Sequence, residues 1–261
     1  MSKILFPTDF SQTANNAFLY ALNLANVLDK EIKIITFKTH LRDYLNLEEE
    51  EFNSKTEELK EIAKQNNFEH IKITFSLEIG EFLMSLLDIV NKENVDYIVM
   101  GTKGENTLSE KFFGSQTLSV VNNSTVPVLA IPKDVKFKPK RNFAYATMFS
   151  DKEESAIQDM IQIAKKHESN LDVLHVEKKS IGADMLLTKR EWEVNHPNIE
   201  VKMLQGNDVE DTLFLYCKEH HIDVLGIVRR EMGPLQSLFA TNHSKQILNH
   251  AEFAVMIFRE N

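Results

Sequence analysis

The chain repeats itself once, at the scale of a whole domain. FPTDFS near the N-terminus returns as YATMFS, and IITFK returns as VLHVE, each 139 residues later. DYIVMG returns as DVLGIV after 127 residues, and this spacing holds without a gap to the apolar segments LAI and MIF. A repeat of this length indicates a duplicated domain and not a short solenoid unit.

Within the first copy, apolar runs of strand length alternate with helical patterns. The predicted strands are residues 3–6, 32–37, 71–75, 97–100 and 126–131, and the predicted helices are residues 14–28, 48–65, 81–91 and 115–122. Ser11 is the expected N-cap of the first helix. The 12 residues that the second copy lacks fall between its second and third strands, where the first copy has a long acidic helix. This alternation predicts right-handed βαβ units and a mainly parallel sheet in each copy.

The repeat predicts two domains, at residues 1–133 and 141–261. Residues 134–140 belong to the segment PKDVKFKPKR, whose prolines and lysines are typical of a linker. The net charge of −9 argues against a broad nucleic-acid or anionic-membrane surface. Because Cys217 is the only cysteine, neither a disulfide framework nor a cysteine zinc site can form, which favours a reducing compartment. With no signal-peptide pattern and no membrane-length apolar run, we expect a cytoplasmic protein.

A group of glycines in the first copy carries the clearest chemical signal. A predicted strand ends at Gly101, Gly104 follows it, and Gly114 and Ser115 open the next predicted helix. Backbone N–H groups can approach an anion closely only where no Cβ intervenes, and a helix N-terminus adds partial positive charge. The pattern therefore predicts a phosphate-binding loop, and glycines that serve only the turns are the alternative.

The spacing Gly101-x2-Gly104-x9-Gly114-Ser115, with Asp9 after the first strand, resembles the nucleotide-binding pattern of the universal stress protein family. The resemblance covers the whole chain as two tandem copies, of which the first is the close match. It implies two Rossmann-like domains with five-stranded parallel sheets in the order 3-2-1-4-5. It also implies an internal pseudo-dimer, formed by residues 126–131 against residues 253–258, and leaves a further homodimer open.

The same resemblance implies an adenine-nucleotide site, with ATP and with or without Mg²⁺, in the first domain. In this strand order the first and fourth strands meet at the topological switch point, where open α/β sheets bind ligands. The matching positions for adenine and ribose are Pro7, Thr8, Asp9 and Phe37. The matching positions for ribose and phosphates are Met100, Gly101, Gly104, Gly114, Ser115 and Gln116. Lys103 is interpreted as a solvated loop lysine, and a contact with the phosphates is the alternative.

The second copy departs from the pattern at every one of its decisive positions. Asp9, Gly101, Gly104, Gly114 and Ser115 are replaced there by Met148, Val228, Glu231, Thr241 and Asn242. We therefore expect no ATP in the second domain, which is kept for its shape or for a different ligand. Since its strands and helix persist without these glycines, we expect the glycines of the first copy to serve a ligand.

Two function classes stay open. One is an ATP-binding stress-response regulator with at most slow ATP hydrolysis, and the other is a scaffold that recognises a different small ligand or a protein partner. An ATP-using enzyme would need a catalytic base or a substrate domain, and the sequence indicates neither. We interpret Cys217 as a buried, inert thiol and Trp192 as a packing residue. The histidines, His220, His221, His243 and His250, are interpreted as surface or satisfied side chains and not as metal ligands.

Overall fold

The computed structural model describes residues 2–38, 49–102, 114–178, 182–196, 198–229 and 253–260. They form two compact units, the first ending at Phe137 and the second beginning at Lys138. This division falls inside the segment that was predicted to be the linker. Within the described ranges, no helix is long and apolar enough to cross a membrane.

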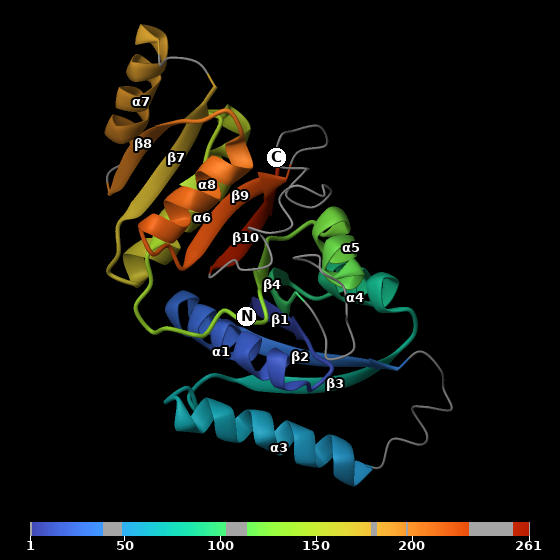
Figure 1. Ribbon diagram of the computed structural model, residues 1–261. Helices are drawn as coiled ribbons and strands as arrows, with labels where there is room; N and C mark the ends of the chain where they lie inside the picture. The colour runs from blue at the N-terminus through green and yellow to red at the C-terminus, as the bar shows by residue number, and fades with distance from the viewer. Residues whose placement is uncertain are drawn as a thin grey trace. The chain divides into compact units, whose positions relative to one another are not determined.

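The first unit is a parallel sheet with helices on both faces (Figure 1). Its strands lie in the order β3-β2-β1-β4-β5, and all four neighbouring pairs are parallel. Helices α1 and α3 pack together on one face of the sheet, and α4 and α5 pack together on the other. The elements are β1 (Lys3–Pro7), α1 (Gln12–Leu28), β2 (Glu31–Lys38), α3 (Glu49–Gln65), β3 (Ile73–Ile79), α4 (Phe82–Lys92), β4 (Val95–Gly101), α5 (Ser115–Asn123) and β5 (Val128–Ile131).

Strand β1 lies at the centre of this sheet and is buried on both faces. Ile4, Leu5 and Phe6 are fully buried, as expected for a strand that helices cover from both sides. The ring of Phe6 packs against Phe18 of α1, with 5.3 Å between the ring centroids. This packing holds the carboxyl end of β1 against α1.

The five predicted strands of the first unit are all observed, but their ends differ from the predicted ones, and the differences in β3 and β5 have an evident cause. Strand β3 begins at Ile73 and continues to Ile79, because it pairs with β2 as far as Lys38. Strand β5 begins at Val128 and not at residue 126, since Pro127 has no N–H to donate to a sheet ladder. The predicted N-cap is confirmed, with the hydroxyl of Ser11 accepting a hydrogen bond from the N–H of Ala14.

The segment predicted as a linker is hydrogen-bonded to its surroundings. In the first unit, the side chain of Asn16 donates to the carbonyl of Val135 at 2.6 Å and accepts from the N–H of Phe137 at 3.2 Å. In the second unit, the carboxylate of Asp223 accepts from the N–H of Asn142 and from the ammonium group of Lys138. These bonds anchor both parts of the segment, so it is not a free spacer.

The second unit repeats the strand order of the first, as β8-β7-β6-β9-β10. The predicted order 3-2-1-4-5 is therefore confirmed in both units. Val173, Leu174, Leu213 and Leu225 are buried in the core of this unit. The predicted pairing of the two last strands stays a prediction. The elements are β6 (Phe143–Ala146), η1 (Asp151–Glu153), α6 (Glu154–Lys166), β7 (Leu171–Glu177), α7 (Ala183–Asn195), β8 (Ile199–Gln205), α8 (Val209–Glu219), β9 (Val224–Arg229) and β10 (Ala254–Arg259).

The duplication is preserved in the backbone just after the first strand of each unit. Phe10 and Phe149, which are 139 residues apart, have φ angles of 58° and 57°. The N–H of each donates to the hydroxyl of the preceding threonine, at 2.9 Å for Thr8 and 2.8 Å for Thr147. This shared turn makes the two units directly comparable at the carboxyl ends of their first strands.

Candidate functional site

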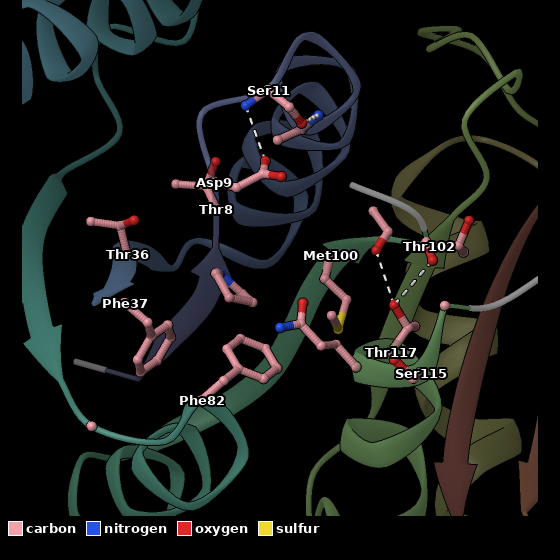
Figure 2. Close-up of a pocket in the computed structure, with 16 residues that line it drawn as sticks. Thr8, Asp9, Ser11, Thr36, Phe37, Phe82, Met100, Thr102, Ser115 and Thr117 are labelled. Atoms are coloured by element: carbon pink, nitrogen blue, oxygen red, sulfur yellow. Dashed lines mark hydrogen bonds between the residues drawn. The ribbon is translucent and has the colours of Figure 1, made fainter. Parts of the chain in front are cut away.

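A cavity of about 380 Å³ lies at the carboxyl ends of β1 and β4 in the first unit. Neighbouring strands whose crossovers leave on opposite faces of the sheet open a crevice at this point. The volume lies in the range of small-molecule sites. Figure 2 shows side chains from β1, β2, β4 and the starts of α4 and α5 around it.

Nine of the ten predicted site residues line this one cavity. They are Pro7, Thr8, Asp9, Phe37, Met100, Gly101, Gly114, Ser115 and Gln116. The tenth, Gly104, and the neighbouring Lys103 lie outside the described residues. The remaining lining residues were not predicted from the sequence: Ser11, Ala14, Thr36, Gly80, Phe82, Thr102 and Thr117. Thr36, Thr102 and Thr117 adjoin a predicted residue in sequence, whereas Ser11, Ala14, Gly80 and Phe82 do not.

Asp9 lies where the chain turns from β1 into α1. Its Oδ1 accepts a hydrogen bond from the N–H of Ser11 at 3.0 Å, which fixes the carboxylate beside the cavity (Figure 2). Asp9 is exposed and is the only titratable side chain among the described lining residues. A fixed carboxylate can accept hydrogen bonds from ligand hydroxyl or N–H groups.

The N-terminus of α5 borders the opposite end of the cavity. Its N-cap is Gly114, which has no side chain to bond the free N–H groups of the first turn. These donors and the helix dipole favour an anion at this end. The hydroxyl of Thr117 donates to the carbonyl of Gly101 at 3.1 Å, so the first turn of α5 is held against the end of β4.

Gly114 also has a packing role, which modifies the expectation drawn from the second copy. A Cβ at this position would lie 2.9 Å from the carbonyl oxygen of Thr102, closer than real Cβ atoms approach other atoms. The backbone itself is tightly bonded there, because the N–H of Gly114 donates to the same oxygen at 2.7 Å. The close approach of α5 to β4 therefore requires glycine at position 114 whether or not a ligand is bound.

In the second unit, larger polar side chains stand at two positions that border the cavity in the first. Glu153 corresponds to Ala14, and His175 corresponds to Thr36. Glu153 is 2% exposed and accepts a 2.5 Å hydrogen bond from the hydroxyl of Thr147. Nδ1 of His175 lies 3.0 Å from the carbonyl oxygen of Thr147, and the imidazole packs against Phe149 with 4.7 Å between ring centroids. In the second unit, therefore, protein side chains surround the carboxyl end of β6.

Of the other sequence candidates that the structure describes, the histidines, Trp192 and Cys217 lie outside the cavity lining. His220 stacks on Tyr216 at 4.0 Å, and Trp192 packs against Phe149 at 5.1 Å between ring centroids. Cys217 is buried, and this burial raises the pKa of its thiol, so it is a poor nucleophile. Among the residues that the structure describes, no three His, Cys, Asp or Glu side chains form a metal-binding group, whereas His243 and His250 lie outside them.

An open parallel sheet with helices on both faces defines a doubly wound α/β protein, and its cavity lies beyond the carboxyl ends of the strands, where open sheets of this kind bind ligands. The family model described as the Universal stress protein family matches residues 1–132, half of the chain. The chain belongs to the universal stress protein family, as the glycine spacing predicted.

Two archaeal relatives and one solved structure illustrate the similarity. Universal stress protein MJ0577 of Methanocaldococcus jannaschii is 33% identical over 153 residues, which cover 50% of this chain and 94% of that protein. Universal stress protein MJ0531 of the same organism is 29% identical over 143 residues, covering 51% and 84%. The crystal structure of a universal stress protein from Archaeoglobus fulgidus shares the fold, with a TM-score of 0.72 at 17% identity, and covers 99% of this chain and 96% of its own.

Proposed function

We propose that this protein binds an adenine nucleotide, ATP, in its first domain. The observation that carries the proposal is that residues from β1, β2, β4 and α5, chosen from the sequence for this role, line a single cavity. Its two ends differ in chemistry. The exposed carboxylate of Asp9 suits ribose hydroxyls, and the first turn of α5 suits the phosphates. Mg²⁺ would enter as part of the nucleotide complex.

We propose further that the second domain binds no nucleotide. The carboxylate of Glu153 holds the hydroxyl of Thr147 and also lies 3.2 Å from the N–H of Met148. A buried carboxylate at this position repels an anionic ligand, and the imidazole of His175 takes the place of the smaller Thr36. The second domain then serves as a folded partner of the first or recognises something other than a nucleotide.

The chemistry of the lining residues favours a regulator over a catalyst. Hydrolysis of ATP is faster when a base positions the attacking water and cations stabilise the phosphates. Among the described lining residues, Asp9 is the only candidate base, and its Oδ1 already accepts from Ser11. We therefore expect a cytoplasmic stress-response protein whose nucleotide occupancy changes its interactions, with hydrolysis that is slow or absent.

Calorimetric titration of ATP into protein stripped of nucleotide tests the proposal. The account expects one ATP per chain, and a Ser115→Ala variant that binds about tenfold more weakly, because a hydroxyl donor to a phosphate is lost. Ser119→Ala is the matched control, since Ser119 lies one turn further along α5 and outside the cavity lining. Absence of any binding heat in the stripped wild-type protein would favour the alternative, a scaffold for a different ligand or a protein partner.

A further inference from the structure

Two phenylalanines from different elements meet at one end of the cavity. Phe37 lies near the end of β2 and Phe82 is the first residue of α4, and both line the cavity. Their rings contact edge to face, with 5.1 Å between the centroids and 80° between the planes. In Figure 2 both rings lie at the same end of the site, away from Ser115 and Thr117.

The turn before α4 fixes the position of Phe82. Gly80 has a φ of 144°, a backbone conformation that residues with a Cβ rarely adopt, so this turn requires glycine. The N–H of Gly80 donates to the carbonyl of Lys38 at 3.0 Å, which ties the turn to the end of β2. Glu81 then caps α4 by accepting from the N–H of Met84 at 2.9 Å. The aromatic corner is therefore built before any ligand enters.

The second unit has lost both rings. The residue that corresponds to Phe37 is Val176, and the first residue of α8, which corresponds to Phe82, is Val209. Because β7 and α8 form in the second unit with valine at both positions, the fold does not require the aromatic pair. The pair is present only in the copy that has the glycine pattern and the cavity lining described above.

We propose that Phe37 and Phe82 form a stacking corner that makes the site selective for purine over pyrimidine nucleotides, with Phe82 as the specificity-determining residue. This inference rests on the proposed nucleotide function. The free energy of stacking on an aromatic side chain becomes more favourable as the area of the base increases. A bicyclic purine covers more of the corner than a pyrimidine does. The phosphates bind at the other end of the cavity, so the corner acts on the base alone.

Affinities of ATP, GTP, CTP, UTP and inorganic triphosphate for four forms of the protein test this inference. The forms are wild type, Phe82→Leu, Phe82→Tyr and Phe75→Leu. Phe75 lies in β3 outside the cavity lining, so its leucine variant controls for the loss of an aromatic ring. Thermal unfolding of each form shows whether it is folded.

The inference expects Phe82→Leu to lose about tenfold in ATP and GTP affinity. It also expects a smaller loss for CTP and UTP and an unchanged affinity for triphosphate. Phe82→Tyr keeps the ring and should keep the purine preference, as should Phe75→Leu. Wild type that binds ATP and CTP equally, or a Phe82→Leu variant with the wild-type purine preference, overturns this inference and leaves the proposed function standing. Wild type that binds no nucleotide overturns both.

Discussion

The N–H of Gly114 lies 2.7 Å from the carbonyl oxygen of Thr102 and donates a hydrogen bond to it. This bond closes the loop between β4 and α5 at its base, so the first turn of α5 starts directly beside the end of β4. A helix N-terminus in this position can serve as an anion site, because its donors are held in place before a ligand arrives. The glycine that the packing requires and the glycine that the ligand would need are the same residue.

A Gly114→Ala substitution should therefore destabilise the first unit as well as weaken ATP binding. The added Cβ would lie 2.9 Å from a backbone oxygen, which cannot rotate away. We expect a loss of about 1–3 kcal/mol in the free energy of unfolding, typical of an overpacked site, measured by urea denaturation.

Gly182→Ala is the matched control, because Gly182 is also a helix N-cap and a Cβ there would meet nothing within 4 Å. Any general cost of alanine at an N-cap is shared by both variants. Equal destabilisation of the two variants would contradict the close-approach argument for Gly114.

A glutamate introduced into the first unit at the position that corresponds to Glu153 should weaken ATP binding. Ala14→Glu places at the cavity the residue type that stands at the corresponding position, Glu153, in the second unit. We expect at least a tenfold loss of ATP affinity, because the side chain takes up room and its charge repels the phosphates. Gln12→Glu adds the same charge to an exposed position of the same helix and should bind ATP nearly as well as wild type.

If Ala14→Glu binds ATP with wild-type affinity while remaining folded, Glu153 is not what excludes nucleotide from the second unit. Circular dichroism of both variants separates this outcome from simple unfolding.

The second unit should lose stability between pH 6.5 and pH 4. Burial and the nearby guanidinium of Arg141 lower the pKa of His167 to about 4, whereas an unfolded histidine titrates near pH 6.5. Between these values the unfolded chain binds the proton and the folded chain does not, so the stabilisation is complete above about pH 6.5 and is lost as the pH falls toward 4.

Because the His167 ring is only half-buried, we expect an effect of about 1 kcal/mol after solvent screening. The measurement is chemical denaturation at pH 7, 5.5 and 4.5, followed by tryptophan fluorescence, since Trp192 lies in this unit. In the His167→Gln variant, the free energy of unfolding should depend less on pH between pH 6.5 and pH 4. An unchanged profile in the variant would assign the pH dependence to other groups.

The alternation of strands and helices was predicted from local patterns, whereas the strand order, and with it the position of the cavity, came from the resemblance to the universal stress protein family. Apolar runs, helical spacing and the Ser11 cap place the elements, and the glycines mark where β4 gives way to α5. The contribution of Phe82 could not be predicted, because its place beside Phe37 depends on a turn at Gly80 and on the packing of α4. The packing requirement at Gly114 was also missed, since it is set by a distance to Thr102 that no spacing in the sequence encodes.

The contrast between the units was predicted only in part. Replacement of Asp9 by Met148 was visible in the repeat, and it indicated the loss of a ligand group. The sequence did not show that Glu153 occupies a position equivalent to one that lines the cavity, because nothing in the sequence indicated that Ala14 borders a cavity. Only the structure shows that its counterpart in the second unit bonds Thr147 at the end of β6.

The measurement that tests the central claim most directly is the stoichiometry of ATP binding to nucleotide-stripped protein, determined by native mass spectrometry across an ATP titration. The account predicts one ATP per chain at saturation, and a folded Ala14→Glu variant that needs at least tenfold more ATP to reach the same occupancy. A wild-type chain that stays free of nucleotide, or one that takes up two, would contradict it.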